Sequence, residues 1–236
     1  MNAVRVSGNF SYLLIALIGF LVLTAVQAEY SAIGDRYFLS IAFSATMIIG
    51  IWSIVHLHRW FVIGMILLVV NVLSVLLQEL AGLYWTEYIS LASILLFYVL
   101  TTLLAFKALL HGAEVDRNKI MGSICVYLLV GISWGILFYL ENRIHPGAFR
   151  GLATGDGKDE FIELLYYSYV TISTLGYGDI TPVSPVARTL AFIEALFGQF
   201  YIAILVAGFV GLHLGSQRRT YVSSTTQDNN GHKEQE

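Results

Sequence analysis

Six long apolar segments, separated by short polar stretches, dominate the hydrophobic pattern of the chain. Their ranges are 11–28, 37–57, 60–80, 86–106, 120–141 and 188–212. A helix that crosses a bilayer needs about 20 mostly apolar residues, and each segment approaches or exceeds that length. The pattern therefore predicts an all-α membrane protein with six transmembrane helices.

Composition supports the membrane interpretation. Hydrophobic residues make up 57% of the chain and charged residues 12%, against about 25% charged residues in an average soluble domain. The net charge of −3 gives no indication of nucleic-acid binding. The single cysteine, Cys125, lies in an apolar segment, where we expect a small buried thiol. The first segment follows Arg5 as in a signal peptide, but it exceeds the roughly 7–15 apolar residues of such peptides, so we predict a retained helix.

The distribution of basic residues predicts the orientation, because Lys and Arg concentrate in cytoplasmic loops. With the N-terminus inside, eight basic residues lie on the cytoplasmic side and five outside, and ten of the sixteen acids lie outside. We therefore expect both termini to be cytoplasmic.

A different pattern lies between the fifth and sixth apolar segments. A polar, glycine-rich stretch at 141–160 is followed by FIELLYYSYVTIST at 161–174 and by TLGYGD at 174–179. A helix over 161–174 spans about 20 Å, so it enters the membrane and stops partway. Non-helical backbone at that depth is tolerated only where protein buries it or where it lines a water-filled cavity. The pattern thus predicts a re-entrant half-helix and a loop that lines an aqueous space.

The loop Thr174-Leu175-Gly176-Tyr177-Gly178-Asp179 resembles the selectivity-filter signature of potassium channels. The pore unit of that family would cover about 120–212. The whole chain resembles prokaryotic six-helix channels through ICVYLLVGISW, HPGAF and EALFGQFYIAILVAGFVGLH. This resemblance implies a homotetramer in the lipid of the cell inner (cytoplasmic) membrane, with K⁺ as the permeant ion and no cofactor.

The resemblance also divides the chain into four parts. A four-helix, sensor-like membrane domain (1–106) is joined by a linker (107–119) to a pore domain (120–214) with an outer helix, pore helix, filter and inner helix. The polar tail (215–236) lacks an apolar core and is expected to be disordered in the cytoplasm. No soluble regulatory domain is expected in this chain, and the linker is the best candidate for coupling the four-helix domain to the pore.

The chemistry of the loop follows from what a K⁺ ion needs. Rings of backbone carbonyls replace the water shell of the ion at several successive sites. Such carbonyl geometry requires positive φ, which Gly176 and Gly178 adopt without steric cost. We expect the Thr174 hydroxyl at the innermost site and Asp179 at the outer mouth, where it raises the local cation concentration. The residues assigned to the filter are Thr174, Leu175, Gly176, Tyr177 and Gly178, with K⁺ at the first four. The side chains of Leu175 and Tyr177 are expected to point away from the axis. One chain supplies one loop, so a ring demands a cyclic oligomer.

Supporting residues follow from the resemblance. In the half-helix, Tyr166 and Tyr167 occupy the positions of an aromatic pair that braces the filter. Val170 replaces a glutamate that some relatives bond to the filter aspartate. Gly198 corresponds to the hinge of the inner helix, although a glycine in a membrane helix is often a close-packing position.

Two further features of the sixth segment are candidates. The positions that correspond to a cavity lining are Gln199, Ile202 and Val206. Glu194 is the one acid that lies away from the ends of a predicted span, and such residues are functional candidates by default. Contact with the pore helix and a merely structural bond are equally open for Glu194.

The first four segments lack the residues of a voltage sensor. Such a sensor needs several arginines at three-residue intervals, whereas the fourth segment has no charge between Glu87 and Lys107. We therefore expect no voltage sensing of that kind. Among the few polar residues, Asn71 and Gln78 are predicted to bond neighbouring helices.

Two histidines, His56 and His58, could form a metal or pH-sensing site, but without carboxylate or cysteine neighbours the interfacial interpretation is favoured.

Three alternatives accompany the channel hypothesis. A less selective monovalent cation channel is disfavoured by the intact Gly-Tyr-Gly. A membrane sensor or enzyme whose GYGD is only a loop is disfavoured because the spans carry no paired carboxylates, His-Glu motif or Ser/His arrangement. A transporter would need paired discontinuous segments in two corresponding halves, whereas this sequence predicts one half-helix. We therefore predict a channel rather than an enzyme.

Overall fold

The structure is a computed structural model of the 236-residue chain, and it describes residues 10–29, 38–53, 58–83, 85–110, 117–152, 157–205 and 207–208. The helices are α1 (Phe10–Glu29), α2 (Phe38–Ser53), α3 (His58–Ala81), α4 (Thr86–Leu110), α5 (Arg117–Ile144), α6 (Gly157–Ile172) and a last helix at Pro185–Leu205. Two short strands, β1 (Phe149–Arg150) and β2 (Thr181–Pro182), pair antiparallel on either side of α6 in sequence.

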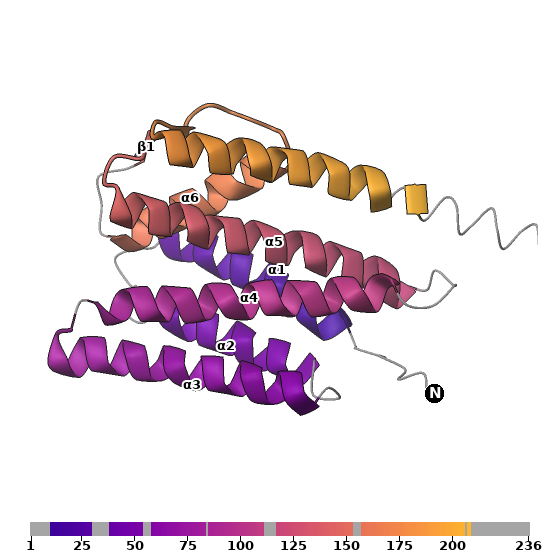
Figure 1. The fold of residues 1–236 in the computed structure, drawn as a ribbon, viewed down its shortest axis with the longest axis horizontal. Coiled ribbons are helices and arrows are strands. Elements are labelled where there is room, and N and C mark those ends of the chain that lie inside the picture. The colour runs from indigo at the N-terminus through magenta and orange to yellow at the C-terminus, as the bar shows by residue number, and fades with distance from the viewer. Residues whose placement is uncertain are drawn as a thin grey trace, which may run out of the picture.

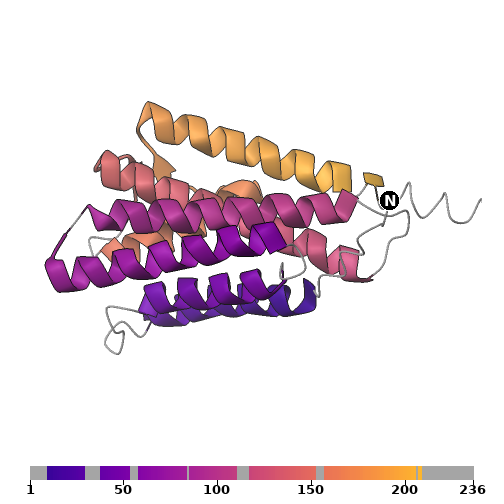
Figure 2. The ribbon, with the colours of Figure 1, turned by 60° about the horizontal axis from the view of Figure 1, so that its bottom comes forward.

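The long helices lie side by side with their axes close to parallel, and α6 lies behind α5 in Figure 1. The last helix, drawn in orange and yellow, lies at the edge of the bundle beyond α5, with α3 at the opposite edge. Figure 2 shows the last helix again on the side opposite α1 and α2. Helices suit this apolar sequence because a helix satisfies its own backbone hydrogen bonds where no water is available.

Among the described residues, five helices are long and apolar enough to cross a membrane: α1, α3, α4, α5 and the last helix. The predicted second span, 37–57, corresponds to α2, which has 16 residues. At 1.5 Å per residue this is about 24 Å, less than the roughly 30 Å of a hydrocarbon core. Residues 54–57, which include His56, lie outside the described residues, and the side chain of His58 is not described.

Of the first four helices, α1, α2 and α4 contact α5 or α6, the two helices that precede the loop. Phe43 on α2 meets Phe161 on α6 edge to face, with 5.2 Å between ring centroids. At the start of α1, the backbone nitrogen of Phe10 donates to Asn118 on α5 (3.2 Å), and the Cys125 thiol donates to the Phe10 carbonyl (3.5 Å). Cys125 is fully buried, which confirms the expected buried thiol. Both ends of the predicted linker (107–119) are helical, because α4 continues to Leu110 and α5 begins at Arg117.

Polar side chains inside the four-helix part bond to one another. Asn71 on α3 accepts from the Ser90 hydroxyl on α4 (2.7 Å) and donates to Ser44 on α2 (3.4 Å), which confirms the prediction for this residue. Thr46 and Tyr98 form a second pair, 2.6 Å apart. Gln78, for which a bond between helices was also predicted, lies at an exposed position. Pairing removes the cost of burying polar groups in an apolar environment.

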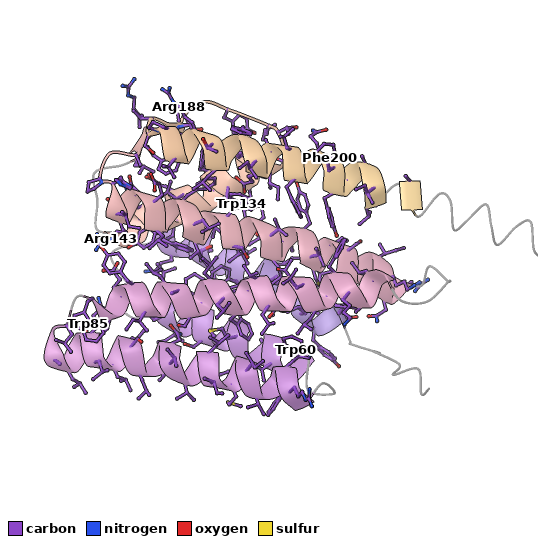
Figure 3. All side chains as sticks on the ribbon, viewed as in Figure 1. Trp60, Trp85, Trp134, Arg143, Arg188 and Phe200 are labelled. Carbon is purple, nitrogen blue, oxygen red and sulfur yellow. The ribbon has the colours of Figure 1, made fainter. Side chains whose placement is uncertain are left out.

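At one end of the bundle, α4 and α5 are joined by an ion pair. Arg143 lies 2.9 Å from Glu87, and the Tyr139 hydroxyl donates to the same carboxylate at 3.3 Å. Figure 3 shows Arg143 at the same end as Trp85, while Trp60 lies at the other end of the α3–α4 pair. Tryptophans at the two ends of membrane helices are typical of residues that lie in the interfaces. The sequence does not indicate a role for Glu87, because its partner Arg143 is 56 residues away in the chain.

Candidate functional site

The site is built around α6, the half-length helix that the sequence pattern predicts at 161–174. The structure has it at Gly157–Ile172, which is 16 residues and about 24 Å. Asp159 and Glu160 lie in its first turn, where the positive end of the helix dipole favours acids. Its C-terminal end carries the partial negative charge, and TLGYGD begins there at Thr174, two residues after Ile172.

A six-residue hydrogen-bonded turn ends α6. The Leu175 nitrogen donates to the Val170 carbonyl (2.9 Å), and the Thr174 nitrogen donates to the Thr171 carbonyl (2.9 Å). These two bonds, with Thr174 at φ 58°, form the Schellman motif that commonly closes a helix. The position of Thr174 usually holds glycine, because left-handed φ is unfavourable for β-branched residues. No feature of the residue pattern predicts this conformation for a threonine.

The loop after α6 alternates in backbone handedness. Gly176 and Gly178 have φ values of 59° and 81°, as predicted for these glycines. A Cβ added at either glycine would meet no heavy atom within 4 Å, so conformation rather than crowding demands glycine here. The side chains of Leu175 and Tyr177 are exposed in the single chain, at 56% and 66%. Two large apolar side chains are thus exposed on a loop whose backbone has positive φ at three alternate residues.

Tyr166 joins α6 to the far end of the loop. Its hydroxyl donates to Asp179 at 2.7 Å, and the other carboxylate oxygen of Asp179 accepts from the Ile180 nitrogen at 3.0 Å. The bond from Tyr166 lowers the pKa of the Asp179 carboxyl, because it stabilises the charged form. Asp179 is exposed, which leaves its charge in contact with solvent.

Tyr167, the next residue, faces the opposite way and is buried in an aromatic cluster. Its ring lies 5.1 Å from that of Phe138 on α5 and 5.4 Å from that of Phe149 on β1. Val170 is buried at 7% exposure and contributes through its backbone carbonyl. The two tyrosines thus contact different parts of the site. Tyr166 bonds to the loop, and Tyr167 packs against α5 and β1.

The segment that leaves the loop is held by residues 145–151. The Val183 nitrogen donates to the Ala148 carbonyl at 2.8 Å, next to the β1–β2 pairing. A Cβ on Gly151, which has φ 94°, would overlap the Asp179 carbonyl oxygen. The stretch HPGAF carries only a resemblance to channels in the sequence, and it does not predict that residues 145–151 form a clamp on the segment after the loop. The glycines and the proline after α5 indicate a turn, but they do not show which segment the turn contacts.

A carboxylate at the end of α5 strengthens the same clamp. Glu141 accepts from the Ser184 hydroxyl at 2.9 Å and lies 3.2 Å from His145 Nδ1. Ser184 caps the last helix, because its hydroxyl also accepts from the Ala187 nitrogen at 3.0 Å. The segment that follows the loop is therefore held at two points, at strand β2 and at the start of the last helix.

The last helix closes the inner end of the site. The Gln199 amide donates to the Thr174 hydroxyl at 3.0 Å. A Cβ on Gly198 would overlap the Ile172 carbonyl oxygen at the end of α6, so the two helices touch backbone to backbone there. Ile202 is exposed, Val206 lies outside the described residues, and so does the tail from 209 onward. Figure 3 places Phe200 and Arg188 on this helix at the edge of the bundle.

Glu194 lies on the inward side of the last helix and is fully buried. Its Oε1 is 2.5 Å from the Ser168 hydroxyl on α6, and that hydroxyl is 2.7 Å from the Gly131 carbonyl on α5. The structure therefore places Glu194 in contact with α6, one of the two alternatives left open by the sequence.

Comparisons with known proteins point to the same segment. Residues 124–212 match a family model described as an ion channel. Two-pore potassium channel 5 of Arabidopsis thaliana is 34% identical over 90 residues, which are 38% of this chain and 20% of that protein. Two-pore potassium channel 3 of the same plant is 33% identical over 111 residues, 47% of this chain and 24% of the relative.

A bacterial protein is also similar. Inward rectifier potassium channel Kirbac3.1 of Paramagnetospirillum magnetotacticum is 31% identical over 88 residues, 32% of this chain and 29% of that protein. The chain thus spans less than a third of the length of these relatives. The matched family and relatives are ion channels, not enzymes, and the apolar helices indicate a multi-pass membrane protein. The part of the chain that carries most of α5, α6, the loop and the last helix is therefore similar to ion channels.

Proposed function

We propose that the chain forms a potassium-selective channel, in which TLGYGD of each subunit supplies one side of a carbonyl-lined filter. The observation that carries the proposal is the half-length helix α6 ending in a loop with positive φ at Thr174, Gly176 and Gly178. A stretch of backbone in this geometry cannot cross hydrocarbon unless it lines a wet space. The names of the relatives, which are potassium channels, support K⁺ as the ion.

The roles of the residues follow from their places. Carbonyl oxygens of the filter residues replace the water shell of K⁺, and the Thr174 hydroxyl, held by Gln199, forms the innermost site. Asp179, kept ionised by its low pKa, concentrates cations at the outer mouth. The C-terminal end of α6 adds partial negative charge toward the ion.

The assembly we propose is a homotetramer with a cytoplasmic N-terminus in a prokaryotic cytoplasmic membrane. One chain has one loop, so a closed ring needs rotational symmetry. The exposed side chains of Leu175 and Tyr177 support this, because neighbouring copies would cover them. The basic residues, eight against five, support the orientation.

The test is the reversal potential of the purified chain in planar bilayers with K⁺ on one side and Na⁺ on the other. We expect reversal near the K⁺ equilibrium potential. Reversal near zero with good conductance would favour a less selective cation channel, and no conductance at any voltage would count against a constitutive pore.

A pair of alanine variants makes the test specific to the filter. Gly178 and Gly82 have φ values of 81° and 62°, and a Cβ on either would meet nothing within 4 Å. Both substitutions therefore carry a similar backbone cost of about 1–2 kcal/mol. We expect Gly178→Ala to abolish K⁺ selectivity and Gly82→Ala, between α3 and α4, to leave it intact. Equal loss from both would show that selectivity does not depend on the geometry of the loop.

A further inference from the structure

Three helices meet around one serine behind the loop. The Ser168 hydroxyl of α6 reaches the Gly131 carbonyl of α5 because α5 and α6 are unusually close there: a Cβ on Gly131 would come 2.8 Å from Cζ of Tyr169. On its other side the same hydroxyl lies 2.5 Å from Glu194 of the last helix. Ser168, Glu194 and the backbone of Gly131 form a continuous polar chain across the three helices, and both side chains are fully buried.

Counting hydrogens along this chain decides who donates. A serine hydroxyl has one hydrogen, and a backbone carbonyl can only accept. Ser168 must therefore give its hydrogen to Gly131 if the 2.7 Å contact is a hydrogen bond. The hydrogen in the 2.5 Å contact then has to come from Glu194. A carboxylic acid carries such a hydrogen, whereas a carboxylate does not.

The surroundings of Glu194 support the same assignment. Glu194 Oε2 is buried without a hydrogen-bond partner among the described residues, and within that part of the chain Glu194 forms no ion pair. The titratable groups that act on it from α5 and α6 are the hydroxyls of Tyr127, Tyr167 and Tyr169. A buried carboxylate with one hydrogen bond and no cation is far more costly than a neutral acid with one free carbonyl oxygen.

We propose that Glu194 is a neutral carboxylic acid that donates to Ser168, and that the chain Glu194–Ser168–Gly131 is the positioning element that holds α6 between the last helix and α5. Ser168 lies six residues before Thr174, so a shift of α6 moves the start of the loop. The positioning role rests on the proposed function, whereas the protonation state of Glu194 does not.

The protonation state is tested by infrared spectroscopy of the full chain in lipid vesicles at neutral pH. A protonated carboxylic acid has a carbonyl-stretch band above the amide region that shifts in D₂O. We expect this band in the wild type and its loss in Glu194→Gln, with a frequency shift in Ser168→Ala. A spectrum of Glu194→Gln without loss of such a band would overturn the assignment.

The positioning role is tested with variants that separate charge, donor and packing. Glu194→Gln keeps a donor at similar size, so we expect wild-type K⁺/Na⁺ selectivity and unfolding temperature. Glu194→Leu and Ser168→Ala remove the link, and we expect both to lower the unfolding temperature and to lose selectivity. The matched control is Ser133→Ala, because the buried Ser133 hydroxyl donates only within α5, to Leu129 at 2.8 Å.

The outcomes are distinguishable. Equal behaviour of Ser168→Ala and Ser133→Ala, or a Glu194→Gln variant as impaired as Glu194→Leu, would overturn the positioning role. A wild type that conducts Na⁺ as well as K⁺, but has the infrared band and the expected order of unfolding temperatures, would refute the proposed function and support the neutral Glu194–Ser168 link.

Discussion

Gly198→Ala tests whether the last helix needs glycine for close packing against α6 or for bending. An added Cβ would overlap the Ile172 carbonyl oxygen and come 2.9 Å from its carbon. The obstacle is backbone at the end of a capped helix, so it cannot rotate away as a side chain would. The variant has to separate the last helix from α6 by a few tenths of an ångström or more.

The magnitude follows from two opposing effects. Overpacking in a well-packed interior costs about 1–3 kcal/mol. Replacing glycine by alanine inside a helix gains up to about 1 kcal/mol. With a rigid backbone obstacle we expect the upper part of the range and a net loss of about 2 kcal/mol. For a chain of this size that lowers the unfolding temperature by roughly 4–8 °C.

The assay is thermal unfolding of the purified full chain in detergent, followed by circular dichroism. The controls are Gly208→Ala, beyond the end of the last helix at Leu205, and Gly19→Ala in α1, because a Cβ at either position meets nothing within 4 Å. Both should be neutral or slightly stabilising. A Gly198→Ala variant as stable as these controls would refute the packing argument, and a hinge would then be the better reason for glycine at this position.

Three further predictions concern the outer end of the site. Tyr166→Phe removes the donor to Asp179, so the pKa of Asp179 rises toward 3.8 and acid block of conductance begins at a higher external pH; an unchanged pH profile would contradict this. Glu87 and Arg143 are partly exposed, at 21% and 38% for their side chains, so a double-mutant cycle with Glu87→Gln and Arg143→Gln should give a coupling energy below about 1 kcal/mol in thermal unfolding, and a much larger value would be inconsistent with a solvent-screened pair. Gly151→Ala should lower both the unfolding temperature and K⁺/Na⁺ selectivity, because its Cβ would displace the Asp179 carbonyl, whereas normal selectivity would show that the clamp is independent of the loop.

The acid sensitivity of Asp179 has a definite sign. Its folded-state pKa is lowered, so the stabilisation from Tyr166 is complete above the ordinary pKa and is lost as the pH falls through the folded value. The effect is therefore confined to acid conditions, and no change is expected near neutral pH.

Much of the helical fold could be predicted from the sequence, because length and apolarity alone define a membrane helix. The ranges of α1, α3, α4 and α5 agree closely with the predicted segments. The last helix begins at Pro185, three residues before the predicted span, because proline at a first helical position is favoured and Ser184 caps it.

The loop was predictable where residue chemistry admits one answer. Positive φ at Gly176 and Gly178 follows from the absence of a Cβ, and the structure has it. Positive φ at Thr174 could not be foreseen, because a β-branched residue disfavours that conformation and only the cap at the end of α6 imposes it. Local conformational preference therefore predicts the positive φ of Gly176 and Gly178 but not that of Thr174.

The contacts that hold the loop in place were beyond sequence reasoning because they join residues far apart in the chain. Ser168 and Glu194 are 26 positions apart and Thr174 and Gln199 are 25 apart, and their patterns alone give no distance. Together with the Gly198 contact they tie the inner end of α6 to the last helix. Tyr166 and the 145–151 segment hold the outer end through Asp179. Because the loop itself has few internal hydrogen bonds, its width has to depend on these outside contacts, and substitutions there should alter selectivity without touching a filter residue.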